Sequence, residues 1–382
     1  MTMPENATRQ IKQAALALGF DQVGVTRSIA FEEAEVQLER WIQEGRHGAM
    51  EYLKLYRERK QKFFENFPDA RSVLVLGVNY FTHDPARPDK LGLGRVARYA
   101  RGLDYHTVIR QKHARLLESM QAMNLGVFRA ESCVDTKPLP ERYAAMQAGL
   151  GFFGKNTMLL SRQFGPWLYL SEIVTNLDLE EDRMAEGHCG TCDHCQTACP
   201  TGALDQDYRM DARRCIAYLT IEYKGVIPRE MRPYIKDWIF GCDECLTVCP
   251  FTSKERETTW SELKPEAGKG AWLDMDLLFG VRSNREYEEL FRGTALLRAN
   301  RKQMWRNACI VLGNTANPAA LPYLKRAADD PAPLVRQHAA WALGRIPGPE
   351  ARRMLEAWGG QEADTAVQEE IRHALQETAS AI

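Results

Sequence analysis

Eight of the ten cysteines lie close together, between Cys189 and Cys249. Four form a C-x2-C-x2-C-x3-C-P run that starts at Cys189 and ends at Cys199-Pro200. In two-cluster ferredoxins the fourth cysteine of such a run ligates the other cluster. The spacing therefore predicts two [4Fe–4S] clusters. The first is expected on Cys189, Cys192, Cys195 and Cys249, and the second on Cys199, Cys215, Cys242 and Cys245.

Other uses of these cysteines fit the pattern less well. A disulfide framework needs an oxidising compartment, and the N-terminal residues show no export signal. Zinc ribbons do not use paired runs of this spacing. No C-x3-C-x2-C run occurs, which argues against radical S-adenosylmethionine chemistry. The interval between Cys215 and Cys242 is longer than in ferredoxins and predicts a helical insertion.

Two polar stretches could hold a reacting substrate, at 98–106 and 133–142. Asp135 is expected to end an apolar strand, where an acid can reach a pocket and have a raised pKa. Its alternative role is the N-cap of a helix from about 139, although it lies early for that. His106 is either a site residue or a partly exposed helix histidine, and both readings remain open.

A G-x-G-x-x-G pattern at Gly149–Gly154 suggests nucleotide binding but lacks the required context. A dinucleotide-binding turn follows a strand, opens a helix and has an acid ~20 residues later. Here a helix is expected at 139–148, before the glycines, and Val174 stands where the acid is needed. The glycines are therefore expected to permit close backbone approach to a flat or bulky neighbour.

The elements that must position these residues change in type along the chain. Residues 1–180 are predicted to form an α+β domain, with helices at 11–18 and 105–123 and strands at 22–26, 71–80, 126–134 and 167–175. A ferredoxin-like segment follows at 181–255, and 256–382 is helical. Within the last segment, 308–320 superposes on 339–351 with an offset of 31 residues. The stretch 330–344 resembles a HEAT repeat, which places Trp341 and Leu343 in its core.

Composition excludes some classes of protein. The 382 residues are 45% hydrophobic and 26% charged, with a net charge of −1, so the chain does not coat nucleic acid by bulk charge. Its longest apolar run, near 73–81, is too short to span a membrane. We therefore expect a cytoplasmic protein without membrane contact.

Local basic patches still permit RNA binding. Residues 281–306 contain seven Lys or Arg against three Glu, and a second group is Lys224, Arg229, Arg232 and Lys236. Such groups can contact the phosphates of an RNA loop, or they can be ordinary solvated helix faces.

The motifs occur together in one order: Arg-Tyr-Ala-Arg-Gly-Leu-Asp-Tyr-His, Cys-Val-Asp-Thr, Gly-Leu-Gly-Phe-Phe-Gly-Lys-Asn-Thr, the ferredoxin spacing and the HEAT-like tail. In this respect nearly the whole chain resembles epoxyqueuosine reductase. The resemblance implies base-off cobalamin beside the two clusters, in a domain similar to that of reductive dehalogenases. It implies reduction of epoxyqueuosine to queuosine at the wobble position (34) of tRNA, the last step of queuosine biosynthesis. An unidentified electron donor and a monomeric state are expected.

The resemblance also implies roles for residues. Asp135 would be the proton donor, and Asp104, Tyr105 and His106 would line the substrate side. Corrin contacts would come from Lys60, Ala97, Asp135, Leu159, Leu170, Ala217 and Asp243. The cluster beside Cys215 and Cys242 would deliver electrons to cobalt. Contacts to tRNA are expected at Lys224, Arg298, Arg301 and Lys302.

Two other functions remain open. A reductive dehalogenase-like enzyme acting on a small organic substrate would share the cofactors, but the missing export signal and basic tail argue against it. A non-catalytic ferredoxin adaptor would leave the domain at 1–180 without a role.

Overall fold

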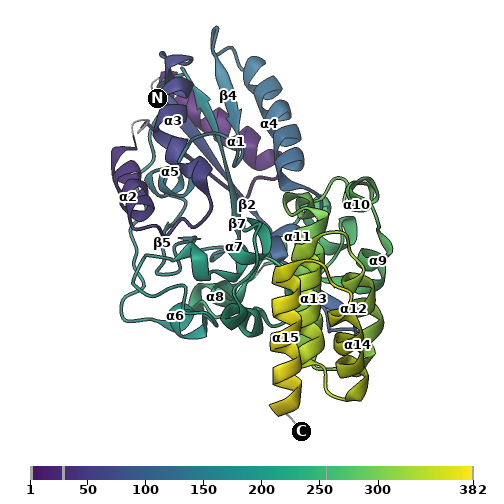
Figure 1. Cartoon of the computed structure of the whole chain (residues 1–382). Coiled ribbons are helices and arrows are strands. Elements are labelled where there is room, and N and C mark those ends of the chain that lie inside the picture. Colours follow the sequence, from purple (N-terminus) through teal and green to yellow (C-terminus); the bar gives the residue numbers. More distant parts are fainter. Residues whose placement is uncertain (1–2, 28–30, 255, 381–382) are drawn as a thin grey trace. The chain divides into compact units, whose positions relative to one another are not determined.

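A computed structural model describes residues 3–27, 31–254 and 256–380 (Figure 1). The chain forms two compact units, each built from three segments. Unit 1 is Met1–His83, Gly102–Arg213 and Asp243–Ala267, and unit 2 is Asp84–Arg101, Arg214–Cys242 and Gly268–Ile382. The division into domains 1–180, 181–255 and 256–382 stays a prediction.

Unit 1 is organised around a four-stranded antiparallel sheet. Its strands run in the order β1 (Gln22–Thr26), β2 (Ser72–Asn79), β7 (Leu168–Thr175) and β4 (Ala130–Cys133). Every residue of β2 and β7 is buried, because both strands are central and helices cover both faces. The four strands occur where the sequence predicts them, although β4 begins later than expected.

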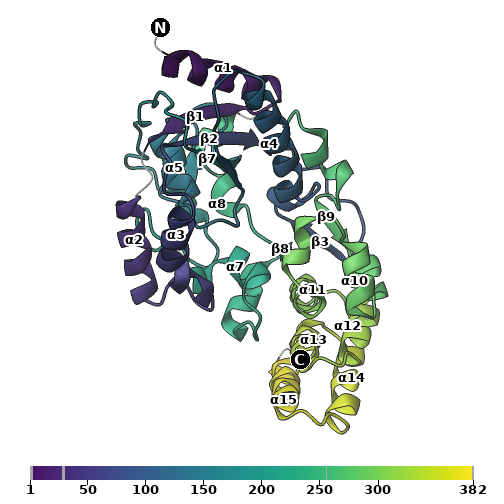
Figure 2. The same ribbon diagram turned by 90° about the horizontal axis from the view of Figure 1, so that it is seen from above.

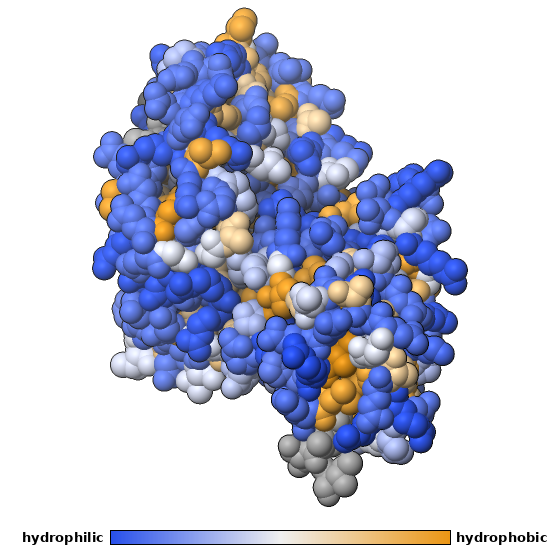
Figure 3. All heavy atoms as spheres, in the orientation of Figure 1, coloured by the Kyte–Doolittle hydropathy of each residue, from blue (hydrophilic) through white to orange (hydrophobic). Residues whose placement is uncertain are grey.

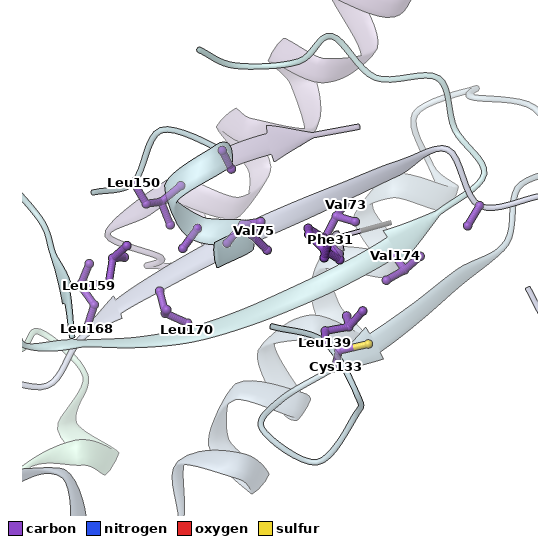
Figure 4. Packing of buried hydrophobic residues seen from close by; sticks show 14 of the residues in the cluster. Phe31, Val73, Val75, Cys133, Leu139, Leu150, Leu159, Leu168, Leu170 and Val174 are labelled. Carbon is purple, nitrogen blue, oxygen red and sulfur yellow. The ribbon is translucent and has the colours of Figure 1, made fainter. Parts of the chain in front are cut away.

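Helices cover the two faces of this sheet (Figure 2). On one side lie α1 (Met3–Ala17) and α4 (Tyr105–Gln121), and His113 of α4 hydrogen-bonds to Ser171 of β7. The other side carries α2 (Glu32–Gln43), α3 (Tyr56–Glu65) and α5 (Glu141–Gln147). Between α5 and the sheet, Val75, Leu170 and Val174 form part of a hydrophobic core (Figure 4).

The remaining elements of unit 1 are short. A hairpin joins β5 (Phe152–Phe153) to β6 (Leu159–Leu160), and α6 (His194–Ala198) packs near α8 (Glu244–Thr247). The two short helices carry cysteines of the ferredoxin-like segment. Loops dominate here because metal ligation rather than a large core is expected to hold such a segment.

Unit 2 combines a small sheet with helices. Its strands are β8 (Trp238–Phe240), β3 (Leu93–Val96) and β9 (Trp272–Asp274). The interval between Cys215 and Cys242 contains α7 (Ile216–Ile221), a 3-10 helix at Arg229–Ile235 and β8, so the predicted insertion is helical only in part. The later helices are α9 (Met275–Gly280), α10 (Asn284–Leu290), α11 (Arg301–Thr315), α12 (Leu321–Ala328), α13 (Pro333–Arg345), α14 (Pro349–Gly359) and α15 (Thr365–Ser380).

The internal repeat corresponds to successive helix contacts in unit 2. A Cβ on Gly313 of α11 would lie 2.7 Å from the Trp341 ring of α13. A Cβ on Gly344 of α13 would lie 2.7 Å from Cβ of Ala374 on α15. The two equivalent glycines therefore let each helix approach the next one. Trp341 and Leu343 are buried, as predicted.

Among the described residues, no helix combines the length and apolar character needed to cross a membrane. The face drawn in Figure 3 is mostly hydrophilic, with hydrophobic residues in scattered spots and small groups.

Candidate active site and cluster-binding cavity

Four of the predicted cluster ligands meet in unit 1. A cavity of about 210 Å³ is lined by Cys189, Cys192, Cys195 and Cys249, together with Lys155, Asn156, Leu160, Pro250 and Phe251. All four cysteines are free thiols, and the backbone N–H of Lys155 donates to Sγ of Cys189 at 3.4 Å. Four sulfurs around one largely apolar cavity, with an amide directed at sulfur, fit the first predicted [4Fe–4S] cluster.

The glycine pattern belongs to this cavity. Gly149 follows α5 with φ of +82°, and a Cβ on Gly151 would lie 2.5 Å from the carbonyl oxygen of Leu160. The helix precedes the glycines, as expected, so a dinucleotide-binding turn is not formed. The bulky neighbour is the β5–β6 hairpin itself, and the close packing brings Lys155 and Asn156 to the cavity wall.

The second ligand set is divided between the two units. Cys199 and Cys245 belong to unit 1, and Cys215 and Cys242 belong to unit 2. The backbone N–H of Ala203 donates to Sγ of Cys199 at 3.3 Å, which is the type of contact that stabilises a cluster thiolate. The assignment of these four cysteines to one cluster remains a prediction from their spacing in the sequence.

The four predicted catalytic residues converge at one end of β4. The Tyr105 hydroxyl donates to Oδ2 of Asp135 at 3.1 Å, and Nε2 of His106 lies 3.2 Å from the same oxygen. On the other side of the ring, Nδ1 of His106 lies 2.7 Å from Oδ1 of Asp104. Asp104 also caps α4 by accepting from the backbone N–H of His106. Asp104 therefore orients His106, and Tyr105 and His106 contact Asp135.

These contacts favour a protonated imidazole. Burial opposes the charge on His106, but hydrogen bonds to Asp104 and Asp135 outweigh burial and raise its pKa to about 9. Burial would raise the pKa of Asp104, yet its bonds to His106 lower it below the ordinary value. At neutral pH the site thus holds a protonated imidazole whose Nε2 lies 3.2 Å from Oδ2 of Asp135.

Asp135 stands on a tight turn rather than at the end of an apolar strand. Three of the four β4 residues are only half-buried, and the strand stops at Cys133. Asp135 has φ of +55°, and the N–H of Thr136 donates to the carbonyl of Val134 at 2.5 Å across it. Such a turn around a non-glycine residue is strained and typical of functional loops. The Asp135 side chain is 56% exposed, and the N-cap of α5 is Pro140.

A row of stacked aromatic rings packs against the site, and the sequence analysis did not predict it. The Tyr105 ring is stacked between His106, at 4.0 Å, and Tyr169 of β7, at 4.5 Å. Tyr80 continues the row at 4.5 Å from Tyr169. Because these tyrosines come from three separate elements, only the fold brings them together.

Two glutamates near Asp135 were also missed. Glu141 accepts a hydrogen bond from the backbone N–H of Asp135, and Glu172 is fully buried within β7. A charged residue in the middle of an otherwise apolar strand was the available signal for Glu172.

Comparison with known proteins identifies the family. The family model for epoxyqueuosine reductase QueG, DUF1730, matches residues 61–136, the 4Fe-4S double cluster binding domain matches 188–252, and HEAT repeats match 293–376. The epoxyqueuosine reductase of Pseudomonas aeruginosa is 38% identical over 352 residues, which cover 90% of this chain and 95% of that protein. The chain belongs to the epoxyqueuosine reductase family. It is therefore an oxidoreductase rather than a non-catalytic adaptor.

Solved structures of epoxyqueuosine reductases agree with this assignment. One, with an epoxyqueuosine-modified tRNA-Tyr stem loop, has a TM-score of 0.87 at 31% identity and covers 98% of this chain and 99% of its own. Another, from Bacillus subtilis, has its aspartate catalytic loop swung out of the active site and a TM-score of 0.85 at 30% identity, covering 97% and 99%. Reductive dehalogenase structures match weakly, with a TM-score of 0.39.

The corrin contacts predicted for this epoxyqueuosine reductase family member also lie in both units. In unit 1, Lys60 pairs with Glu35, Leu159 and Leu170 point into the hydrophobic core, and Asp243 is buried before α8. In unit 2, Ala97 and Ala217 lie in the Asp84–Arg101 and Arg214–Cys242 segments.

The pairing of β7 with β4 in unit 1 ends before it reaches Leu170. β4 pairs with β7 only from Glu172 to Thr175, so the stretch from Leu168 to Ser171 has no partner strand on that side among the described strands. Leu170 therefore lies two residues beyond the end of the β4–β7 pairing.

The predicted RNA contacts need a correction at Arg301. Arg301 is buried and forms a 2.6 Å ion pair with the equally buried Asp330, so it is not available for a phosphate. Arg306, also counted in the basic segment, is fully buried and donates to main-chain carbonyls of unit 2. Arg298 pairs with Glu222 but keeps 56% of its side chain exposed.

Two lysines in unit 2 match the expectation better. Lys224 and Lys302 are exposed. Of the second basic group, Arg232 is buried and paired with Glu370, and Arg229 bonds to Glu370 and Glu377. Of the four predicted tRNA contacts, Lys224, Lys302 and the exposed part of Arg298 therefore remain candidates. Other exposed members of the two basic groups are Lys236, Arg282, Arg285 and Arg292.

Proposed function

We propose that this protein reduces the epoxide of epoxyqueuosine to queuosine at the wobble position of tRNA. In this proposal two [4Fe–4S] clusters pass electrons to cobalamin. The observation that carries it is the Tyr105–His106–Asp135 group, a proton-donating site at the edge of the sheet. The family assignment and the cysteine-lined cavity support it.

The described side chains can hold and transfer a proton. Opening an epoxide leaves an alkoxide, which needs a proton from a nearby acid. His106 carries a proton at neutral pH, and its Nε2 lies within hydrogen-bonding reach of Asp135. Asp135, the more exposed of the two, is the group placed to pass that proton to a substrate. Tyr105 fixes the carboxylate by donating to the same oxygen.

Cobalamin, when bound, supplies the low-potential reductant. Lys60, Leu159, Leu170 and Asp243 of unit 1, with Ala97 and Ala217 of unit 2, are the residues assigned to its contacts. The basis for this cofactor is the family resemblance.

Exposed lysines of unit 2 offer contacts for the RNA substrate. A related structure contains an epoxyqueuosine-modified stem loop, and Lys224 and Lys302 offer exposed positive charge. Lysines of this kind bind phosphates by charge, which makes binding salt-dependent.

A reconstituted enzyme tests the proposed function. Protein carrying clusters and cobalamin is incubated anaerobically with a strong one-electron reductant and an epoxyqueuosine-modified stem loop, and the nucleosides are measured by mass spectrometry. We expect queuosine to form, and Asp135→Asn to slow single-turnover formation at least ~10²-fold with unchanged iron and cobalamin content. Asp89→Asn, an exposed aspartate in unit 2, serves as the control.

Two results would contradict the proposal. Wild-type protein loaded with both cofactors that forms no queuosine would refute the function. An Asp135→Asn variant that reacts at the wild-type rate would remove Asp135 as proton donor and leave His106 or Tyr105 in that role.

A further inference from the structure

The proposed reaction needs more protons than the described donor group holds. Removing an epoxide oxygen breaks two C–O bonds and leaves a carbon–carbon double bond. The balanced step consumes two electrons and two protons and releases the oxygen as water. The electrons come from the cluster-linked reductant of the proposed function, on which this inference rests. His106 supplies one of these protons, and the Tyr105 hydroxyl is used to hold Asp135, so a second proton must reach Asp135 from another group.

Glu141 is an acid that contacts the main chain of Asp135 directly. It begins α5, and its Oε1 accepts from the backbone N–H of Asp135 at 2.5 Å. That contact uses one carboxyl oxygen and leaves the other for a proton. Burial, and then the negative charge of Asp135, raise the pKa of Glu141 to about 8. A neutral Glu141 can still accept the amide bond through its carbonyl oxygen.

Glu172 is more deeply buried than Glu141, since it lies within the fully buried strand β7. It stands opposite Val75 of β2 and Cys133 of β4, on the face of β7 that also carries Leu170 and Val174. Its relative exposure is 0%, and neither carboxyl oxygen has a hydrogen-bond partner among the described residues. An unpaired buried carboxylate is strongly disfavoured, so this group is a neutral acid.

The two glutamates and Asp135 interact electrostatically. Burial and then the charges of Glu141 and Asp135 raise the pKa of Glu172 well above its ordinary value. We propose that Glu141 delivers the second proton to Asp135 and that Glu172 is the buried acid that returns Glu141 to its protonated form.

The proton balance of this relay is simple. After Asp135 protonates the opening epoxide, it is a carboxylate again, and the Glu141 O–H bond breaks as the Asp135 O–H bond forms. Asp135 then gives the second proton to the departing oxygen, which leaves as water. Glu141 takes a proton from Glu172, and solvent restores the set between turnovers. Glu141 acts through Asp135 and does not contact substrate.

Few positive charges that would favour an ionised Glu141 act on this residue. The titratable and charged groups that act on this cluster are Asp135 after β4, His106 on α4, Arg142 on α5, Glu172 on β7, Tyr56 on α3 and Cys133 on β4. Burial raises the pKa of the Tyr56 hydroxyl and of the Cys133 thiol, so both stay neutral. The two positively charged groups, His106 and Arg142, act on three carboxyl groups, those of Asp135, Glu141 and Glu172.

Two substitutions at Glu141 separate proton transfer from positioning. Glu141→Gln keeps a carbonyl oxygen for the Asp135 N–H but has no transferable proton, whereas Glu141→Ala loses both. Glu172→Gln removes the buried acid with nearly the same shape. Glu118→Gln, exposed on α4, is the matched control. Single-turnover formation of queuosine from an epoxyqueuosine stem loop is followed across pH.

A second measurement does not depend on turnover. Infrared spectra of the cofactor-free protein at neutral pH show protonated carboxylic acids by their carbonyl stretch. We expect the signal to shrink in Glu172→Gln and in Glu141→Gln, and to stay unchanged in Glu118→Gln.

The relay predicts that Glu141→Gln is as slow as Glu141→Ala, at least ~10-fold below wild type, and that its rate no longer falls near pH 8. A wild-type rate in Glu141→Gln with a slow Glu141→Ala would assign Glu141 to positioning alone and overturn the relay. Unchanged infrared signals in both Gln variants would also overturn it. Wild-type enzyme that forms no queuosine refutes the proposed function instead, and the infrared result still decides whether the acids are protonated.

Discussion

The protonation of His106 can be tested by changing the carboxylate behind it. Asp104→Asn removes the negative charge 2.7 Å from Nδ1 of His106. Asparagine caps a helix about as well as aspartate, so the start of α4 should be preserved. The substitution thus alters the charge state of His106 with little change in structure.

The expected magnitude follows from the contacts of the ring. The pKa of His106 rises from 6.5 to about 9, which corresponds to about 3 kcal/mol in favour of the protonated ring. The contact to Asp104 is shorter than the 3.2 Å contact to Asp135, so it should supply the larger share. We expect the His106 pKa to fall by at least ~1 unit in Asp104→Asn and by less in Asp135→Asn.

The effect on stability has a definite direction. The pKa of His106 is higher in the folded protein, so its contribution is complete below pH 6.5 and is lost as the pH rises through about 9. In Asp104→Asn this loss should be smaller and should occur at lower pH. Urea unfolding of the cofactor-free protein at several pH values measures the change.

Nuclear magnetic resonance supplies the direct assay. The eight histidines give separate ring signals, and His106→Gln identifies the one that belongs to His106. A His106 pKa that is the same in Asp104→Asn and in wild type would refute the argument that the Asp104–His106 pair holds the proton.

Further predictions concern the clusters, the basic surface and the helical repeat. Anaerobic reconstitution should yield about eight irons and eight labile sulfides per chain, and a stable value near four or stoichiometric zinc would contradict two clusters. Lys224→Glu with Lys302→Glu should weaken tRNA binding and flatten its salt dependence, measured by a filter-binding series, and unchanged affinity would assign both lysines to a solvated face. Arg301→Ala should instead lower the free energy of unfolding by about 3–5 kcal/mol, because it leaves Asp330 buried and unpaired, and a stability loss below about 1 kcal/mol would contradict this. Gly344→Ala should cost about 1–3 kcal/mol by forcing α13 away from α15, and full stability in chemical denaturation would contradict the close contact.

Local patterns in the sequence were enough for several features. The spacing from Cys189 to Cys195 predicted three ligands of one cluster, because thiols so close in the chain can meet around one metal group, and the three line one cavity. The continuous apolar runs at β2 and β7 predicted central strands, since only burial on both faces favours such runs. The repeat glycines, Gly313 and Gly344, likewise correspond to helix contacts.

The site itself depended on contacts between distant segments. Tyr169 of β7 stacks on Tyr105 of α4, and the register of β7 against β4 sets Glu172 opposite Cys133, two residues before Asp135. A contact between distant segments also explains the error at Arg301, because this side chain forms an ion pair with Asp330, 29 residues away in the chain. A sequence shows which side chains can carry charge or a proton. Burial and pairing, which depend on the tertiary structure, decide which of them are free to use it.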